Sequence, residues 1–556
     1  MYTRIDSMNA FNGHVEFTIA LAFICCLLWK PCIAQDVAVT PKAPIPAFST
    51  KQGAANLGVA NSAAAKGISI LEYAHLVVPN SRIPGRTFRD WTPAIKRAIN
   101  DQHQYIYFPP GTYEVMGDQD GEPAFFGRNA AGFKCAWYGA GPWEWPQNGM
   151  ASTIIAYTKV NTDGTALNTL KAERTLNGAR TGEVITTSST IGFWFPRNFT
   201  ARHLAFHLKT YSDEGLNLLG SAPPQATVVR MQKLYQWNNN TADDNDGIIK
   251  YCAFNGSGAN RKVNNENADS GTDIYFEGRG GVFESLNFAS NGAGITLAFP
   301  SDAEQDQRLE AGQGQTAVTH QGSYYGANKL ILRNLKFHSG EMDKIRICGS
   351  VLLRGVHING VTSNDGGTLV RIVGGGLADS QIVNCQVGFS ATPSWNQDLA
   401  ALIDAENCEI WRTVISSCTA HGSDGYDGNR ARRNEGRYEG TRYQHDFPFR
   451  MIHLKPTCKL NGLSITGNNF AFSEAELIRI DDADVRNVIV TGNLLTSPGA
   501  DPDNGSRDDS AVGVYINSNK SGNIKIVNNV FDSYYFDANG NQVRRPNRTS
   551  NIAGSN

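Results

Sequence analysis

Charged and aromatic residues recur between apolar neighbours at a constant distance before a small residue in the last third of the chain. The pairs are Arg371 before Cys385, Asp404 before Cys418, His453 before Asn468, Arg479 before Asn493 and Tyr515 before Asn529. The separation is 14 residues in four pairs and 15 for His453. Arg346, between Ile345 and Ile347, extends the series. Because side chains alternate along a strand, we expect the apolar flanks to face a core and the central residues to form an exposed column.

A second column follows two residues later on the same expected strands, with Glu406, Lys455, Asp481 and Asn517. If these strands are neighbours about 4.8 Å apart, the two columns share one face. Arginine forks match carboxylates and sulfates, so this face predicts binding of an anionic polysaccharide. The expected substrate-binding residues are Arg346, Arg371, Arg450, Arg479, Tyr515 and Glu406.

Two chemistries fit such a face. Removing the proton beside a uronate carboxylate needs a base, here His453 with Lys455 or Tyr515 nearby. It also needs cations that take up the developing charge, here Arg371 and Arg479. This elimination is the favoured hypothesis.

Hydrolysis of a glycosidic bond would instead use paired carboxylates, with Asp404 and Asp481 as the candidates and Glu406 on the same face. Asp404 and Asp481 are expected two rungs apart, about 10 Å, which is slightly beyond the roughly 6.5 to 9.5 Å of inverting enzymes. A third reading has no catalysis, with the charges forming cross-strand ion pairs on a glycan-binding or adhesive protein.

The strands themselves are predicted from a loose repeat. The segments SQIVNCQVGFS (380–390), LSITGNNFAFS (463–473), VIVTGNLLTS (488–497) and IKIVNNVFDS (524–533) share one alternation of apolar and small polar residues. The step from Asn468 to Asn493 is 25 residues and contains a further alternating run. Several short strands in each step, with few helical patterns, predict the stacked rungs of a parallel β-helix.

The first rung needs a cap, since an open stack would leave a bare strand edge. Ala94, Ile95, Ala98 and Ile99 follow Thr92-Pro93 at helical spacing, which predicts a short helix. The run YIYFPPGTYEV (105–115) then gives two strands separated by a Pro-Pro-Gly corner.

Together, DWTPAIKRAI (90–99) and YIYFPPGTYEV (105–115) resemble the N-terminal signature of the pectate-lyase-like superfamily of right-handed β-helices. CAWYGAGPWEWPQNGMASTIIAY (135–157) is similar to that family's next rung. The resemblance implies an all-β fold, a single-stranded right-handed parallel β-helix with a short N-terminal capping helix. Its members include polysaccharide lyases, glycoside hydrolases, epimerases and phage tailspikes. The acidic hydrolase motifs of the family are not matched, so no catalytic residue is carried over from it.

The expected organisation is a signal peptide over 1–34, a linker over 35–66, a β-helix domain over 67–540 and a C-terminal tail over 541–556. The apolar run Phe17–Trp29 is too short to span a bilayer and precedes small residues, which predicts cleavage after Ala34 and a secreted protein. No later segment reads as a transmembrane helix. A formal charge of -2 gives no bulk attraction for nucleic acid. Assembly as a homotrimer is left open.

Two smaller clusters complete the candidates. Asp243, Asp244 and Asp246 offer oxygen ligands in a turn and are a weak calcium site, and no other cofactor is expected. The repeat also places Cys385 beside Cys418 and Cys408 beside Cys458, as stacked core thiols on neighbouring rungs.

Overall fold

A computed structural model describes the chain from Gly67 to Ala553, with gaps. The described residues are 67–126, 136–141, 151–167, 171–176, 179–186, 190–196, 199–217, 226–232, 247–256, 271–276, 280–289, 292–299, 330–338, 343–349, 352–363, 368–388, 400–421, 450–471, 473, 475–481, 484–498, 511–518, 520–532, 534–536, 542–544 and 550–553. The predicted signal peptide and linker lie outside them.

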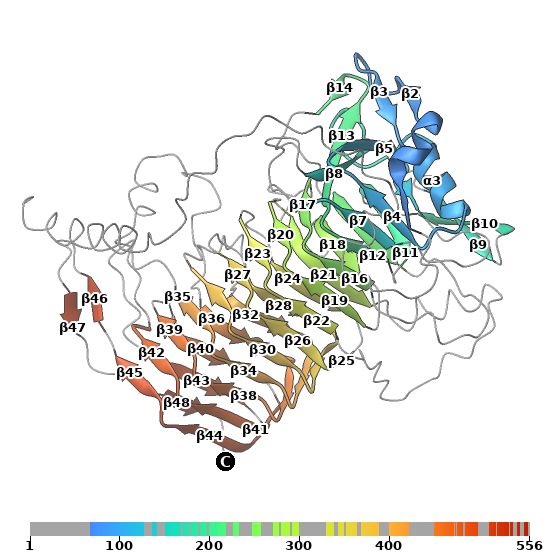
Figure 1. The fold of residues 1–556 in the computed structure, drawn as a ribbon. Helices are drawn as coiled ribbons and strands as arrows, with labels where there is room; N and C mark the ends of the chain where they lie inside the picture. The colour runs from blue at the N-terminus through green and yellow to red at the C-terminus, as the bar shows by residue number, and fades with distance from the viewer. Residues whose placement is uncertain are drawn as a thin grey trace, which may run out of the picture. The chain divides into compact units, whose positions relative to one another are not determined.

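Three long sheets make up this part of the chain (Figure 1). Sheet C contains β6 (Ala124–Phe125), β11 (Ile191–Pro196), β15 (Thr227–Gln232), β18 (Thr272–Phe276), β21 (Ala293–Phe299), β24 (Ile345–Gly349), β28 (Val370–Val373), β32 (Ala400–Glu406), β36 (Arg450–Leu454), β40 (Ile478–Ile480), β43 (Val514–Asn517) and β48 (Ser550–Ala553). All its pairings are parallel and join each strand to the corresponding strand of the next rung.

Sheet B contains β2 (Val78–Asn80), β3 (Phe88–Asp90), β5 (Gly111–Met116), β8 (Ser152–Lys159), β13 (Ala205–Ser212), β14 (Gly215–Leu216), β17 (Ala253–Asn255), β20 (Asn287–Phe288), β23 (Lys336–Phe337), β27 (Thr362–Ser363), β31 (Gln386–Val387), β35 (Thr419–His421), β39 (Asn469–Ala471), β42 (Leu494–Thr496) and β45 (Val530–Asp532). Only the pairs β2 with β3 and β13 with β14 are antiparallel in this sheet as described.

Sheet A contains β1 (Gly67–Ser69), β4 (Tyr105–Phe108), β7 (Ala136–Gly139), β12 (Thr200–Arg202), β16 (Gly247–Lys250), β19 (Gly281–Glu284), β22 (Leu330–Arg333), β25 (Leu352–Arg354), β26 (Val356–Asn359), β29 (Gly376–Ala378), β30 (Gln381–Val383), β33 (Glu409–Trp411), β34 (Val414–Ser416), β37 (Lys459–Asn461), β38 (Ser464–Thr466), β41 (Asp484–Thr491) and β44 (Lys520–Val527). Two antiparallel pairs stand apart, β9 (Lys171–Leu176) with β10 (Ala179–Thr186) and β46 (Tyr534–Phe536) with β47 (Gln542–Arg544).

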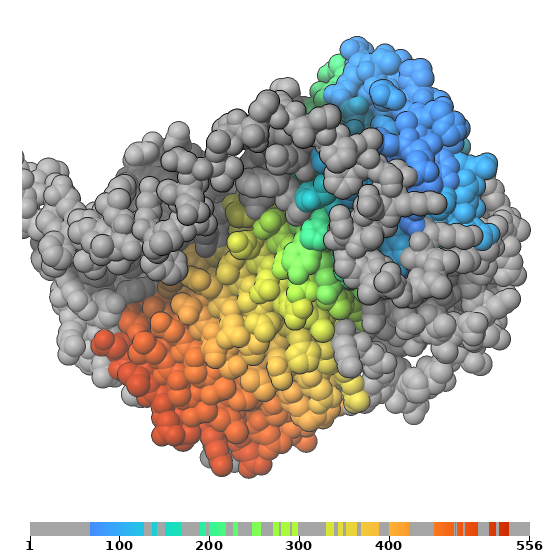
Figure 2. All heavy atoms as spheres, in the orientation of Figure 1, coloured from blue at the N-terminus to red at the C-terminus, as the bar shows by residue number. Residues whose placement is uncertain are grey.

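The chain visits the three sheets in turn, so it has the right-handed parallel β-helix fold expected from its sequence. Figure 2 shows the later rungs following one another from yellow to red across one face. β48 pairs with β43, so sheet C continues to Ala553. No helix of the described part is long and apolar enough to cross a membrane.

The predicted cap and corner are confirmed. Helix α3 (Thr92–Asn100) has Pro93 in its first turn and buries Ala94, Ile95, Ala98 and Ile99, beside the 3-10 helix η1 (Ile70–Leu76). Between β4 and β5 the two prolines turn the chain, and Gly111 has a φ of 154° that side chains disfavour.

The repeated small polar position lies at the turn between sheets A and B. Asn493 Nδ2 donates to Asn529 Oδ1 at 2.8 Å, and Asn468 Nδ2 donates to Asn493 Oδ1 at 2.9 Å. The same two oxygens accept the backbone N–H groups of Asn468 and Asn493, and Asn468 Oδ1 accepts that of Cys418 at 2.9 Å. The sequence alignment by this position is therefore the true register of the rungs.

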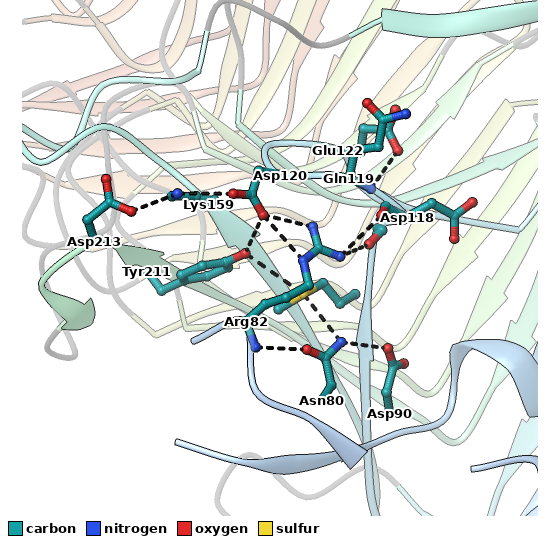
Figure 3. A network of polar contacts seen from close by, with 12 residues as sticks. Asn80, Arg82, Asp90, Asp118, Gln119, Asp120, Glu122, Lys159, Tyr211 and Asp213 are labelled. Atoms are coloured by element: carbon teal, nitrogen blue, oxygen red, sulfur yellow. Dashed lines mark hydrogen bonds and ion pairs between the residues drawn. The ribbon is translucent and has the colours of Figure 1, made fainter. Parts of the chain in front are cut away.

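An N-terminal arm, residues 78–90, adds β2 and β3 to the end of sheet B and packs against outward side chains of that sheet. Ile83 and Phe88 of the arm pack with Tyr157 and Tyr211 in a small apolar cluster. Around it, Arg82 and Lys159 both pair with Asp120, at 2.9 and 3.0 Å (Figure 3). These cations lower the pKa of the Asp120 carboxyl even though burial alone would raise it. The polar network thus fastens the arm to the coil.

Candidate functional site

The predicted column is in register on sheet C. Cα pairing joins Arg346 to Arg371, Arg371 to Asp404, Asp404 to His453, His453 to Arg479 and Arg479 to Tyr515. In Figure 1 the strands that carry them, β24, β28, β32, β36, β40 and β43, lie side by side in this order. The flanking residues Val370, Ile372, Ile403, Ile452 and Ile478 are in the core, as the alternation predicts.

The column is not exposed, however. Arg346, Arg371, Arg450 and His453 are each 3% exposed, and Asp404 is 0% exposed. The expectation of an exposed column was wrong for these residues, because charged side chains of the same or of an adjacent rung lie against them. Glu406, Lys455, Arg479, Asp481 and Tyr515 are half-buried and form the part of the network that solvent reaches.

Asp404 is the centre of the first half of the network. Its Oδ1 lies 3.4 Å from Arg371 Nη1 and 3.2 Å from Lys455 Nζ, although no hydrogen bond of good geometry reaches either oxygen within the described residues. Burial raises the pKa of the Asp404 carboxyl, and the neighbouring cations only partly oppose this. Glu406 also pairs with Arg371, at 3.2 Å, and with Lys455, at 3.8 Å.

His453 and Asp481 form the centre of the second half. His453 Nε2 lies 2.9 Å from Asp481 Oδ2, and Arg479 Nε donates to the same oxygen at 2.6 Å. Burial alone would raise the pKa of Asp481, but these hydrogen bonds hold it below its ordinary value. The guanidinium of Arg479 stacks over the Tyr515 ring, 5.0 Å from its centroid.

Two members of the network were missed in the sequence. Asp343 pairs with Arg346 at 3.1 Å, and Glu476 pairs with both Arg450 and Arg479, at 3.0 and 3.2 Å. Both acids stand three residues before a column residue, as Arg450 does before His453. A search at this second fixed offset would have found them.

The arrangement supplies a histidine oriented by a carboxylate, a buried carboxyl with a raised pKa, and several cations. Arg346, Arg371 and Arg479 each pair with at least one acid. A substrate carboxylate would therefore join these acids as a further acceptor around the guanidinium groups. Such a network can transfer protons, because it combines a carboxyl of raised pKa, a carboxylate of lowered pKa and an imidazole within one series of close contacts.

The calcium candidates Asp243, Asp244 and Asp246 lie outside the described residues. Within the described part, no group of three or more possible metal ligands occurs. Cys408 Sγ lies 3.4 Å from Cys458 Sγ, and both are buried free thiols, as are Cys385 and Cys418, so the stacked-thiol prediction is confirmed.

No protein-family model and no curated protein sequence matches the chain. Among solved structures, the catalytic domain of a GH87 alpha-1,3-glucanase is similar over 89% of this chain and 69% of its own, with 12% identity and a TM-score of 0.34. The mannuronan C-5 epimerase AlgE4 A-module of Azotobacter vinelandii is similar over 87% of this chain and all of its own, with 9% identity and a TM-score of 0.34. The tailspike protein 2 of bacteriophage CBA120 is similar over 88% and 46%, with 9% identity and a TM-score of 0.32. Scores this low carry no argument about activity.

Proposed function

We propose that this chain cleaves an anionic, uronate-containing polysaccharide by β-elimination on the outer face of sheet C. The observation that carries the proposal is the 2.9 Å contact between His453 Nε2 and Asp481 Oδ2. A lowered pKa keeps Asp481 ionised, so its Oδ2 accepts the N–H of Nε2 and orients the imidazole. An imidazole oriented in this way is suited to proton abstraction.

The cations have the second role in this reaction. Abstraction of the proton beside a uronate carboxylate places negative charge on that carboxylate, and a nearby cation stabilises it. Arg479 and Lys455 are the best placed cations of the two columns, since their side chains are 28% and 14% exposed. Arg479 is paired with His453 on the next rung, and Lys455 follows His453 by two residues on the same rung. Arg346 and Arg371 are buried and would act on the substrate through the network.

Hydrolysis by two carboxylates is the second candidate. Asp404 has a raised pKa and Asp481 a lowered one, which is the division expected of a proton donor and an ionised partner. The strand pairing separates their rungs by two steps, about 10 Å, so this pair fits an inverting hydrolase less well than His453 and Asp481 fit elimination.

The test is a paired assay of the purified protein on polygalacturonate, alginate, hyaluronan and neutral glucans. Ultraviolet absorbance reports the unsaturated uronyl ends made by elimination, and a reducing-end assay reports every cleavage. We expect both signals to rise together on at least one polyuronate. Reducing ends without absorbance would replace elimination by hydrolysis. No signal, together with binding of a polyuronate, would leave the column as an ion-paired binding surface.

We also propose that the protein is exported, from the leader sequence alone. The mature form would begin at Gln35, after cleavage behind Ala34. Intact-mass measurement of protein recovered from outside the producing cells would show that N-terminus. Recovery of the full-length chain with membranes would contradict it.

A further inference from the structure

Cys408 and Cys458 lie side by side at the corner where the coil passes from sheet C to sheet A. Their sulfurs are 3.4 Å apart, and both residues are buried. The strands that follow, β33 and β37, pair Glu409 with Lys459, so the two cysteines stand in register on neighbouring rungs. Adjacent rungs are about 4.8 Å apart, within the roughly 4.4 to 6.8 Å between Cα atoms that a disulfide requires. The backbone spacing therefore permits a bond between the two sulfurs.

The corner that presents these sulfurs includes a strained residue. Asn407 and Thr457, which directly precede the cysteines, have φ angles of 51° and 79°. Asparagine tolerates this left-handed region, but a β-branched threonine is an outlier there. Thr457 Oγ1 donates to Asn407 Oδ1 at 2.5 Å and accepts the backbone N–H of Asn407 at 3.1 Å. These two hydrogen bonds join the corners of neighbouring rungs and keep the cysteines side by side.

The two thiols differ in acidity. Cys458 Sγ donates to the carbonyl of Ala405 at 3.3 Å, which leaves Cys408 as the donor in the contact between the sulfurs. That hydrogen bond favours the thiolate of Cys458 and lowers its pKa, whereas the same contact and burial raise the pKa of Cys408. The thiolate is the form that attacks a disulfide. Cys458 is therefore the sulfur that we expect to react first.

We propose that Cys408 and Cys458 form a disulfide between rungs when the chain folds in the presence of glutathione disulfide. The Cys458 thiolate attacks one glutathione sulfur and releases one glutathione thiolate. Cys408 then loses its proton and attacks the Cys458 sulfur of the mixed disulfide, which releases the second glutathione thiolate. The protein thiols lose two electrons, glutathione disulfide gains them, and the two protons pass to the released thiolates. Because both sulfurs are buried in the folded chain, this exchange belongs to folding, before the rungs enclose them.

The disulfide would fasten the corner that carries two members of the charged network. Glu406 stands two residues before Cys408, and Lys455 stands three residues before Cys458. Lys455 Nζ lies 3.8 Å from Glu406 Oε2 across the same two rungs. The bond would close a loop between cysteines 50 positions apart and so reduce the entropy of the unfolded chain. It would fix the rung spacing beside this ion pair whatever substrate the face binds.

The test is refolding of urea-unfolded protein in mixtures of reduced and oxidised glutathione, with a parallel sample kept in dithiothreitol. Free thiols are alkylated in denaturant, and the peptides are identified by mass spectrometry. We expect the peptides that contain Cys408 and Cys458 to be joined after oxidative refolding and to separate on reduction. Alkylated, unlinked peptides after oxidative refolding would overturn the proposal. So would either cysteine joined to a different one or left with glutathione attached.

The melting temperature of oxidised and reduced samples, followed by circular dichroism, is the second readout. We expect the oxidised protein to melt about 4 °C higher, from the loop entropy. The same comparison within Cys408→Ser and within Cys458→Ser should show no difference, however stable each variant is. Cys252→Ser is the matched control and should keep the full difference, since Cys252 is a buried free thiol that donates to the Lys250 carbonyl at 3.3 Å.

Amide hydrogen exchange locates the effect of the bond. Exchange at residues 406–408 and 455–458 should be slower in the oxidised protein than in the reduced one. A linked peptide with neither slower exchange nor a higher melting temperature would contradict the stabilising role of the disulfide. None of these measurements requires turnover. Their failure would therefore leave the proposed function in place, and failure to cleave any polyuronate would leave the disulfide in place.

Discussion

His453 on β36 and Asp481, directly after β40, meet across neighbouring rungs, with Nε2 of one 2.9 Å from Oδ2 of the other. The pairing of β36 with β40 sets this contact, because it places Arg479 beside His453 and carries Asp481 two residues further on the same face. Arg479 then donates to the same carboxylate oxygen. The backbone register of the coil thus brings together a histidine and a carboxylate that are 28 positions apart in the sequence.

Asp481→Asn tests the orienting role of this carboxylate. The amide keeps the shape but removes the negative charge that the imidazole faces, so we expect kcat on a cleaved polyuronate to fall about 10²-fold or more with KM nearly unchanged. The control is Asp484→Asn, whose acid pairs with Arg486 on sheet A, away from the column. An equal fall of kcat in both variants, or an effect confined to KM, would contradict a role in proton transfer.

The pH dependence of stability tests the protonation of Asp404. Because its pKa is raised in the folded state, the folded protein binds the proton more tightly than the unfolded chain does. The free energy of unfolding should therefore decrease as pH rises from the ordinary aspartate value, near 3.9, through the raised one. The slope from one proton is at most about 1.4 kcal/mol per pH unit.

Asp404→Asn should remove this component, so the variant should gain stability relative to wild type with rising pH in urea denaturation. Glu406 still faces Arg371 and Lys455 in the variant. Asp379→Asn should show the opposite trend, with stability falling relative to wild type as pH rises, since Arg412 lowers the pKa of Asp379. A relative loss for Asp404→Asn as pH rises would mean that the charged carboxylate stabilises the fold.

Asn493→Ala tests the asparagine ladder between sheets A and B. The side chain is buried, and its loss leaves the carbonyl of Ile465 and the N–H of Asn468 without their partners. We expect the free energy of unfolding to fall by about 2 kcal/mol or more. Asn461→Ala removes a similar ladder contact at an exposed turn and should cost less than about 0.5 kcal/mol. An equal decrease in the free energy of unfolding for both variants would show that burial does not determine how much a ladder asparagine stabilises the fold.

Asp120→Asn tests the attachment of the N-terminal arm. The acid joins Arg82 of the arm to Lys159 of β8, but it is half exposed, so the loss of global stability should be below about 1 kcal/mol. The clearer effect should be local, with faster amide hydrogen exchange over residues 78–90. Since the pKa of Asp120 is lowered, the difference should be present near neutral pH and vanish as the carboxyl is protonated in acid. Arg97→Gln, at an exposed pair on α3, should not change exchange in the arm.

The sequence alone predicts the coil well, because period-two alternation and a fixed polar position both follow directly from stacked rungs. Asn468, Asn493 and Asn529 give the register, and the register then places Arg371, Asp404 and His453 beside one another. The helix before the first corner is equally local, since Pro93 and the apolar spacing after it determine α3.

Burial of the column could not be predicted in the same way. Alternation tells which side chains point away from the core, but not whether charged neighbours on adjacent rungs then cover them. Asp343 and Glu476 precede Arg346 and Arg479 by three residues, an offset that period-two alternation does not examine.

The most direct test of the central claim is His453→Ala on a polyuronate that the wild-type protein cleaves, followed by ultraviolet absorbance with and without added imidazole. We expect the rate to fall about 10² to 10⁴-fold, retention in polyuronate gels to stay unchanged, and added imidazole to restore part of the rate. Undiminished absorbance from the variant would contradict His453 as the base and with it the proposed site.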